Sequence, residues 1–332
     1  MWEKSVGVTA ESRTPQRERS AVFAAVGAHV PSIVVTNDDL AARLDTSDEW
    51  ITSRTGIRTR QVVEPGGSTS DLAIAAGMAA LRAAGSDASI DAVVLATSTP
   101  DRLVPATAPA VAAGLGLAGV PAFDVDAVCS GFVYGLAVAN GLIAAATADR
   151  VLLIGADTFS TIVDPTDRAT APLFGDGAGA VVLRAGEPDE PGALLAFELG
   201  SDGALAELIT VRDGWFAMQG QAVYRQAVTR MAGAARGVLA RTGWEPGDVD
   251  SFVGHQANLR ILRAVGADLG VDADRVHTNV TEVGNTVSAS IPLALAHAHA
   301  AGRIRAGHRV LLSAFGGGAT WGAATLVWPE LS

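Results

Sequence analysis

The 332-residue chain has a single cysteine, Cys129. One cysteine excludes an internal disulfide framework, and no CxxC pair or Cys/His cluster offers the spacing of a metal site. We therefore expect no bound metal, and a cytoplasmic location suits a chain that forms no disulfide. The lone thiol is either a small buried apolar residue, which is the commoner state of a free cysteine, or a nucleophile.

Basic residues are also scarce, because 24 Lys and Arg stand against 35 Asp and Glu and give a formal net charge of -11. This charge argues against a general nucleic-acid binder, since neutralising phosphates requires a basic face. An acidic protein partner would need a local basic patch. The 49% of hydrophobic residues is enough for a large core, and the length fits one long α/β unit or two domains.

Targeting signals are missing as well. The first twenty residues mix acids with bases and have no apolar segment, so residues 1–20 are predicted to be a disordered polar tail. One uncharged run, residues 127–148, is long enough to span a bilayer. It contains Cys129, Ser130 and Asn140 and precedes a β-rich segment, which favours a buried central helix over a membrane span.

Apolar periodicity predicts the order β-α-β-α-β-α-β-β twice, in halves 21–188 and 189–332 that join near 186–192. Such a βαβ order implies parallel strands with ligands at their carboxyl ends. Strands are predicted at residues 21–30, 92–98, 122–128, 151–156, 179–184, 193–199, 249–254, 276–280, 309–314 and 323–328. Helices are predicted at residues 71–84, 108–115, 130–146, 222–241, 259–269 and 288–301.

Three polar residues lie at junctions of this pattern. Cys129 is expected at a helix N-terminus, where the helix dipole and unpaired N–H groups favour the thiolate. Asn285 occupies the matching junction of the second half, and His255 follows an apolar strand that can hold the imidazole neutral. If the halves pack about a pseudo-twofold axis, the three side chains meet at one place.

Two glycine-rich segments and a histidine pair have ordinary explanations. Residues 175–179 resemble a phosphate-binding loop but precede a strand instead of a helix, so a tight turn is predicted. Residues 316–318 are three consecutive glycines, which either form a plain turn or expose backbone N–H groups beside a reacting atom. His297 and His299 lie two apart on a predicted helix, a poor spacing for a metal, and are interpreted as structural.

Taken together, eight motifs resemble those of the β-ketoacyl-acyl carrier protein synthase III family. They follow one another from about residue 21 to the C-terminus, which makes the resemblance specific. The motifs are DTSDEWI (45–51), RTGI (54–57), CSGF (129–132), DPTDR (164–168), FGDGAG (174–179), HQANLR (255–260), GNT (284–286) and FGGG (315–318).

The resemblance implies the α/β thiolase fold, a five-layered αβαβα arrangement of two pseudo-duplicated halves, usually in a homodimer. It implies a catalytic triad of Cys129, His255 and Asn285. The thiolate would take an acyl group from acyl-CoA, and the acyl-enzyme would condense with malonyl-acyl carrier protein after decarboxylation. The N–H groups of Cys129 and Gly317 would form the oxyanion hole, and His255 and Asn285 would hold the enolate oxygen.

The resemblance also assigns the substrate-binding residues. No cofactor is implied, because acyl-CoA is a substrate. The coenzyme A site would consist of Trp50, Arg54, Arg168 and Asn258. The patch for the acidic carrier protein would be Arg260, with Arg225 and Arg263 as weaker candidates.

The acyl pocket would be lined by Val104, Phe174 and Phe315. Val104 stands where members that use acetyl primers carry Phe, a residue that reaches the pocket of the partner subunit. We therefore expect a primer longer or more branched than acetyl. Gly254 replaces a usual Pro and Val287 a common Ser, changes that would loosen the site without removing a catalytic group.

Several functions stay open at this point. The family reaction could begin fatty-acid synthesis or, with a special starter unit, polyketide synthesis; the polar N-terminal extension and Val104 favour polyketide priming slightly. An acyltransferase that works through Cys129 without condensation is a second possibility, and a non-catalytic interaction subunit is a third. The single cysteine excludes a thiolase, which requires a second one.

Overall fold

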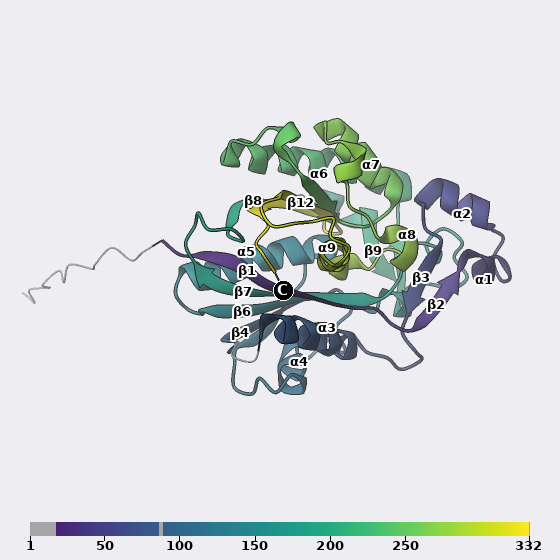
Figure 1. Cartoon of the computed structure of the whole chain (residues 1–332). Helices are drawn as coiled ribbons and strands as arrows, with labels where there is room; N and C mark the ends of the chain where they lie inside the picture. The colour runs from purple at the N-terminus through teal and green to yellow at the C-terminus, as the bar shows by residue number, and fades with distance from the viewer. Residues whose placement is uncertain (1–17, 86–88, 332) are drawn as a thin grey trace, which may run out of the picture.

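Two mixed β-sheets form the framework of the molecule, whose computed structural model describes residues 18–85 and 89–331 (Figure 1). The first sheet has the order β1-β7-β6-β4-β5, with β6, β4 and β5 parallel and β7 antiparallel to both β1 and β6. Its strands are β1 (Ser20–His29), β4 (Ala92–Ala96), β5 (Ala122–Val125), β6 (Arg150–Asp157) and β7 (Gly177–Gly186). The predicted tail lies largely outside the described residues, and its last residue, Ser20, already belongs to β1.

The second sheet has the order β11-β12-β13-β8, in which only β11 and β12 run parallel. Its strands are β8 (Leu194–Ser201), β11 (Ser251–Gly254), β12 (Arg309–Gly316) and β13 (Thr320–Val327). The predicted join at residues 186–192 falls between β7 of the first sheet and β8 of the second.

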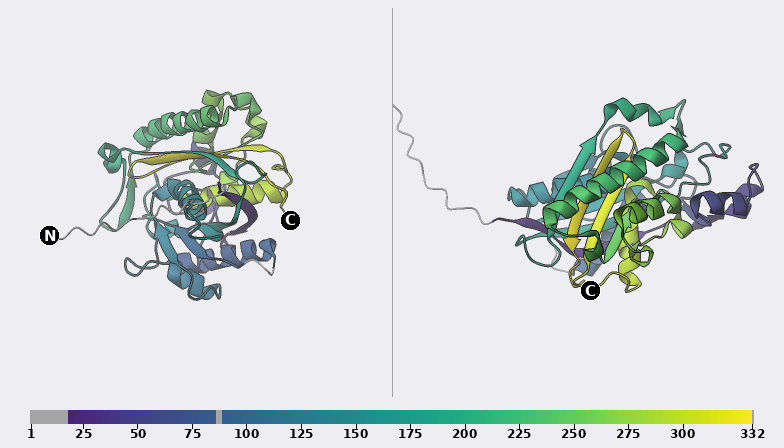
Figure 2. Two further views of the ribbon diagram at one scale, coloured as in Figure 1. Left: turned by 90° about the vertical axis from the view of Figure 1, so that its left-hand side faces the viewer. Right: turned by 90° about the horizontal axis from the view of Figure 1, so that it is seen from above.

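Helices separate and cover the two sheets in three layers (Figures 1 and 2). The central layer, α5 (Gly131–Ala144) and α9 (Ser290–Ala300), packs between the sheets in one apolar core. A second core joins the outer face of the first sheet to α3 (Thr69–Ala84) and α4 (Ala108–Gly114). A third joins the second sheet to α6 (Gly220–Thr242) and α7 (Leu259–Leu269). The predicted five-layered αβαβα arrangement is confirmed.

Helix α5 explains the uncharged run in the sequence. Because α5 is enclosed between two sheets, it buries apolar side chains on several faces, including Phe132, Val133 and Leu136. Among the described residues, no helix combines the length and apolar character needed to cross a membrane. The prediction of a buried central helix is therefore confirmed.

The strand predicted at residues 276–280 is wrong. Only Val276 makes a bridge, to Phe252, and the chain then turns into the short helix α8 (Val280–Val283). The buried side chain of Gln256 takes the place of a neighbouring strand, because its Nε2 donates to His277 O at 3.3 Å and its Oε1 accepts from Asn279 N at 3.0 Å. This local pairing satisfies the backbone without a ladder, so the second sheet has four strands.

Two two-stranded sheets and several short helices were not predicted. One pair is β2 (Ile33–Thr36) with β3 (Thr59–Val62), an antiparallel two-stranded sheet, and the other is the hairpin of β9 (Ile209–Arg212) with β10 (Trp215–Met218). The short α-helices are α1 (Asn37–Ala41) and α2 (Asp48–Thr55). The 3-10 helices are η1 (Val128–Ser130), η2 (Phe159–Thr161), η3 (Gly203–Leu208), η4 (Pro246–Asp248), η5 (Ala273–Arg275) and η6 (Val287–Ala289).

The tight turn predicted at residues 175–179 is also wrong, because β7 already begins at Gly177. A Cβ on Gly175 would lie 2.2 Å from Val283 O, and one on Gly179 would lie 2.7 Å from Leu293 N. The glycines of this motif therefore let other backbone segments approach the strand closely.

Candidate active site

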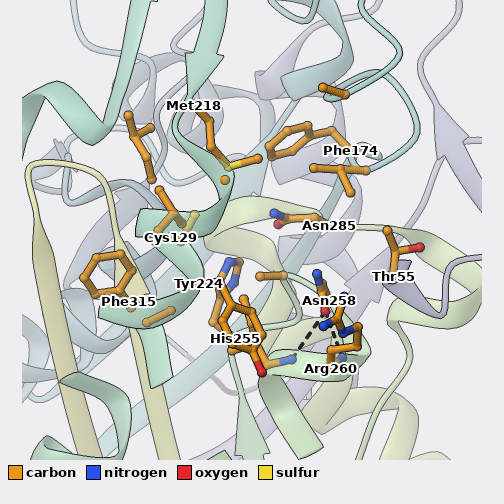
Figure 3. Close-up of a pocket in the computed structure, with 18 of the residues that line it drawn as sticks. Thr55, Cys129, Phe174, Met218, Tyr224, His255, Asn258, Arg260, Asn285 and Phe315 are labelled. Carbon is orange, nitrogen blue, oxygen red and sulfur yellow. Dashed lines mark hydrogen bonds between the residues drawn. The ribbon is translucent and has the colours of Figure 1, made fainter. Parts of the chain in front are cut away.

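One cavity of about 760 Å³ brings Cys129, His255 and Asn285 together (Figure 3). Cys129 comes from η1 of the first half, while His255 follows β11 and Asn285 follows α8 in the second half. The cavity continues past Tyr224 and Asn258 toward Trp50. The three side chains that are far apart in the sequence thus face one space, as the pseudo-twofold argument expected.

Cys129 lies where β5 gives way to α5, and the end of β12 packs directly against its backbone. A Cβ at Gly316 would lie 2.8 Å from Cys129 N and 3.0 Å from Ser130 N, so only glycine allows this approach. Gly317, the predicted second donor of the oxyanion hole, is next along the chain but is not among the residues that line the cavity.

The expectation that the helix N-terminus favours the resting thiolate is wrong. Burial raises the pKa of the Cys129 thiol, and the negative charge of Asp157 raises it further. Cys129 is nearly sealed in its free state, and the loss of hydration for a thiolate outweighs the favourable backbone N–H. The sulfur is therefore a neutral thiol before substrate arrives.

Asp157 joins the two halves of the molecule beside the site. This fully buried carboxylate accepts hydrogen bonds from Ser98 N at 2.7 Å, from the Thr99 hydroxyl at 3.1 Å, and from the backbone N–H and hydroxyl of Ser288. Burial raises the pKa of Asp157 to about 6. These bonds hold the turn that follows Asn285 against the end of the first sheet.

His255 is buried and neutral. Its backbone N–H donates to Ser313 O at 2.8 Å, which continues the β11–β12 pairing by one residue, and its Nδ1 lies 2.7 Å from the Ser290 hydroxyl. Burial lowers the pKa of His255 to about 3. The expected neutral imidazole is confirmed, since a charged ring would lack compensating solvent or a carboxylate.

Hydrogen bonds hold the backbone N–H, the backbone carbonyl and the side chain of Asn285. Its N–H donates to Leu173 O at 2.9 Å, and its carbonyl accepts from Gly175 N at 3.0 Å. Its side-chain Oδ1 accepts from Val287 N at 3.0 Å. This bond fixes the orientation of the amide, and Nδ2 has no hydrogen-bond partner among the described residues, so it can donate to a group in the cavity that Asn285 lines.

Three phenyl rings close the inner part of the cavity. Phe174 lies 4.7 Å from Phe159 and 4.8 Å from Phe216, measured between ring centroids, and Met218 and Cys129 pack in the same cluster. The predicted pocket residues Phe174 and Phe315 line the cavity, but Val104 does not line it and is 81% exposed. Phe159, Phe216 and Met218 were not predicted.

At the outer end of the cavity, Trp50 lies between two guanidinium groups. The Cζ atoms of Arg54 and Arg168 are 4.5 Å and 4.9 Å from the centre of its ring, and Arg168 also pairs with Asp45 at 3.1 Å. Asn258 lines the cavity, and its Oδ1 caps α7 by accepting from Arg260 N at 2.8 Å. Of the predicted coenzyme-binding residues, Trp50, Arg54 and Asn258 line the cavity, whereas Arg168 does not line it but lies beside Trp50.

The comparisons with known proteins decide the family. Residues 123–203 match the family model described as 3-Oxoacyl-[acyl-carrier-protein (ACP)] synthase III, and residues 239–328 match its C-terminal model. The chain is 57% identical over 310 residues to "Beta-ketoacyl-[acyl-carrier-protein] synthase III 2" of Streptomyces coelicolor, which covers 93% of this chain and 94% of the relative. The chain belongs to the β-ketoacyl-acyl carrier protein synthase III family. It is thus an enzyme of the acyltransferase class.

Solved structures of the synthase III family share the whole fold. The crystal structure of 3-oxoacyl-(acyl carrier protein) synthase III from Pseudomonas aeruginosa matches with a TM-score of 0.92 and 52% identity, covering 94% of this chain and 99% of that one. The priming β-ketosynthase of a polyketide biosynthetic pathway matches with a TM-score of 0.90 and 33% identity, covering 97% and 100%. The predicted thiolase fold is confirmed.

The remaining predicted residues of the synthase lie around the cavity mouth. Arg225 on α6 and Arg260 on α7 line the mouth, while Arg263 is exposed one turn further along α7 and does not line it. Arg260 lies over the Tyr224 ring at 5.7 Å. Within the described ranges, no cluster of three or more His, Cys, Asp or Glu has the arrangement of a metal site.

The two departures from the family pattern do not loosen the site. A Cβ at Gly254 would lie 2.7 Å from the Leu262 side chain and 3.0 Å from the Phe252 ring, so this position is tightly packed. Val287 is fully buried and supplies the N–H that orients Asn285. The expectation of local loosening is therefore wrong at both residues.

Proposed function

We propose that this synthase acylates Cys129 from acyl-CoA and then condenses the acyl group with malonyl-acyl carrier protein. In the first step the sulfur of Cys129 bonds to the acyl carbon, the bond from that carbon to the coenzyme A sulfur breaks, and the thiol proton leaves with coenzyme A. The observation that carries the proposal is the single cavity shared by Cys129, His255 and Asn285 and reaching to Trp50. The high pKa of the resting thiol makes its deprotonation part of the acyl-transfer step.

In the second step, the malonyl carboxylate leaves as CO₂ and its electron pair forms an enolate. The enolate carbon bonds to the acyl carbon, and Cys129 departs as a thiolate that takes a proton from solvent. His255 and Asn285 supply neutral donors for the enolate oxygen, and the backbone N–H groups of Cys129 and Gly317 are proposed for the oxyanion on the acyl carbon. Because these neutral donors stabilise the negative charge on the enolate oxygen, the step requires no cofactor.

The substrates are proposed to enter through the mouth beside Trp50. Adenine can stack on the Trp50 ring after one guanidinium moves aside, while Arg54 and Arg168 meet the phosphates and Asn258 the pantetheine arm. Arg225, Arg260 and Arg263 form an exposed basic patch on a protein of charge -11. We propose that this patch binds the acidic carrier protein.

A homodimer is part of the proposal. Leu103 and Val104 are 96% and 81% exposed, which is unusual for two adjacent large apolar side chains, and the edge strand β5 lies in the same sheet as the strand that precedes them. A second subunit would cover both features and bring Val104 to the acyl pocket of its partner.

We also keep a cytoplasmic location as a prediction, because the single thiol forms no disulfide.

To test the proposed function, the full chain is incubated with an acyl-CoA and malonyl-acyl carrier protein, and the mass of the carrier protein is then measured by mass spectrometry. We expect the β-ketoacyl adduct together with release of free coenzyme A. Transfer of the unextended acyl group to the carrier would instead support an acyltransferase without condensation. No adduct with any acyl-CoA would contradict both activities.

The primer is proposed to be longer or more branched than acetyl, in fatty-acid or polyketide synthesis, with polyketide priming slightly favoured. With acetyl-, isobutyryl- and hexanoyl-CoA in competition, we expect the wild type to prefer one of the larger primers. Replacing Val104→Phe is expected to shift the preference toward acetyl by roughly 10- to 200-fold, the range that a single methylene group produces in an apolar pocket. A wild-type preference for acetyl would refute the assignment.

A further inference from the structure

We propose that Ser290 is a positioning residue that fixes His255 in the tautomer carrying its proton on Nε2. Nothing in the motifs or in the resemblance assigns a role to this serine. The proposed tautomer follows from the geometry alone, whereas its consequence for catalysis rests on the proposed condensation.

The contact is short and enclosed. The Ser290 hydroxyl oxygen lies 2.7 Å from His255 Nδ1, and the two residues are 1% and 3% exposed. Ser290 is the first residue of α9, the central helix that packs against both sheets, so its position is set by the core. A contact of this length between buried groups is a hydrogen bond whose direction has to be determined.

The backbone of Gln256 determines that direction. Its N–H can only donate, and it donates to the Ser290 oxygen at 3.3 Å. The one proton of the hydroxyl then needs an acceptor, and within residues 18–85 and 89–331 His255 Nδ1 is the only acceptor in contact with it. A buried hydroxyl without an acceptor would be unfavourable, so Ser290 donates and Nδ1 accepts.

An accepting Nδ1 carries no proton, so a neutral imidazole holds its single proton on Nε2. The ring is neutral because it is buried, and no carboxylate stabilises its charged form. His255 lines the cavity with Cys129 and Asn285 (Figure 3). The ring therefore presents an N–H to the reacting atoms and no lone pair.

The side chain of Asn285, which also lines the cavity, is held by a hydrogen bond in a similar way. Val287 N donates to its Oδ1 at 3.0 Å and so fixes the amide, as the Ser290 hydroxyl fixes the ring of His255. Both side chains thus keep an N–H donor for an enolate oxygen, and His255 in this tautomer has no lone pair left to deprotonate Cys129. The opposite tautomer would direct a lone pair at the developing negative charge.

The tautomer can be measured directly by ¹⁵N NMR of the full chain labelled at histidine, with His255→Ala used to assign the signal. We expect a protonated, pyrrole-type Nε2 and an unprotonated, pyridine-type Nδ1 in the wild type. The reverse pattern would overturn the proposal whether or not the enzyme condenses substrates. An enzyme that shows the expected pattern but forms no β-ketoacyl product would instead contradict the proposed function.

Variants of Ser290 test whether the tautomer of His255 matters for condensation. In Ser290→Ala we expect the Nδ1 signal to move toward the protonated type and condensation to fall roughly 10- to 100-fold, less than the loss of a whole donor. Acyl-enzyme formation should change by less than about threefold, because it does not use this donor. Ser290→Thr, which keeps the hydroxyl, should restore the wild-type nitrogen signals.

Ser251→Ala is the matched control, because it removes another buried hydroxyl that contacts a histidine, His277 Nε2 at 3.0 Å, and Ser251 does not line the cavity. It should leave the His255 tautomer and the ratio of the two steps unchanged. Equal losses in both steps for Ser290→Ala with unaltered nitrogen signals would assign Ser290 a purely structural role and overturn the proposal. If Ser290→Ala does not fold, the ¹⁵N signals of His255 in the wild type alone decide whether the proposed tautomer is correct.

Discussion

The Asn285→Asp variant is expected to form the acyl-enzyme at nearly the wild-type rate but to condense it about 10²- to 10³-fold more slowly. Asp can still accept from Val287 N, as Asn285 Oδ1 does at 3.0 Å, so the local turn is retained. The cavity-facing atom, however, changes from an amide donor to a carboxylate oxygen. That oxygen repels the enolate and cannot donate to it.

The two steps have to be measured separately, acylation by intact-protein mass and condensation by release of the β-ketoacyl carrier protein. Asn140→Asp is a suitable control, because Asn140 Oδ1 also accepts a backbone N–H, from Ala21 at 2.9 Å, and Asn140 on α5 does not line the cavity. We expect little change in either step for this control. A similar loss of both steps in Asn285→Asp would contradict the division of labour.

Replacing Cys129→Ala is expected to have the opposite effect, in which acylation is lost and decarboxylation is retained. The variant should form no acyl-enzyme, and overall condensation should fall by roughly 10⁴-fold or more, as enzymes lose when their nucleophile is removed. The donors of His255 and Asn285 do not depend on the thiol, since they are oriented by Ser290 and Val287. Decarboxylation of malonyl-acyl carrier protein should therefore continue without a condensed product.

The measurement is CO₂ release and conversion of malonyl- to acetyl-acyl carrier protein, with and without acyl-CoA. The double variant Cys129→Ala and Asn285→Asp is the control, and it should decarboxylate far more slowly than Cys129→Ala alone. If Cys129→Ala and the double variant decarboxylate equally slowly, the enolate is not stabilised by Asn285. If Cys129→Ala still accepts an acyl group, the nucleophile is another residue.

Much of the fold follows from patterns in the sequence, because apolar periods carry the information on layers. The uncharged run of α5 could be assigned to the centre of the molecule, since only a helix enclosed by two sheets tolerates apolar side chains on most faces. Residues 276–280 had an apolar pattern like that of a strand, but their partner is the side chain of Gln256. A side chain that replaces a ladder leaves no periodic signal.

The candidate site was predictable as a set of residues but not in its electrostatics. The helix N-terminus at Cys129 indicated a stabilised thiolate, whereas burial of the thiol and, in addition, the negative charge of Asp157 raise its pKa instead. Phe216 and Met218 alternate on β10 and point to the cavity, a period-two signal that four residues are too short to make distinct. Ser290 is visible only in three dimensions, because 35 positions separate it from His255.

The most direct test of the central claim follows the mass of the intact protein through one reaction cycle. After exposure to an acyl-CoA panel, the account predicts a single acyl adduct on the peptide containing Cys129, and its loss when malonyl-acyl carrier protein is added, in step with the appearance of the β-ketoacyl carrier protein. An adduct on another residue, or one on Cys129 that malonyl-acyl carrier protein does not consume, would contradict the account.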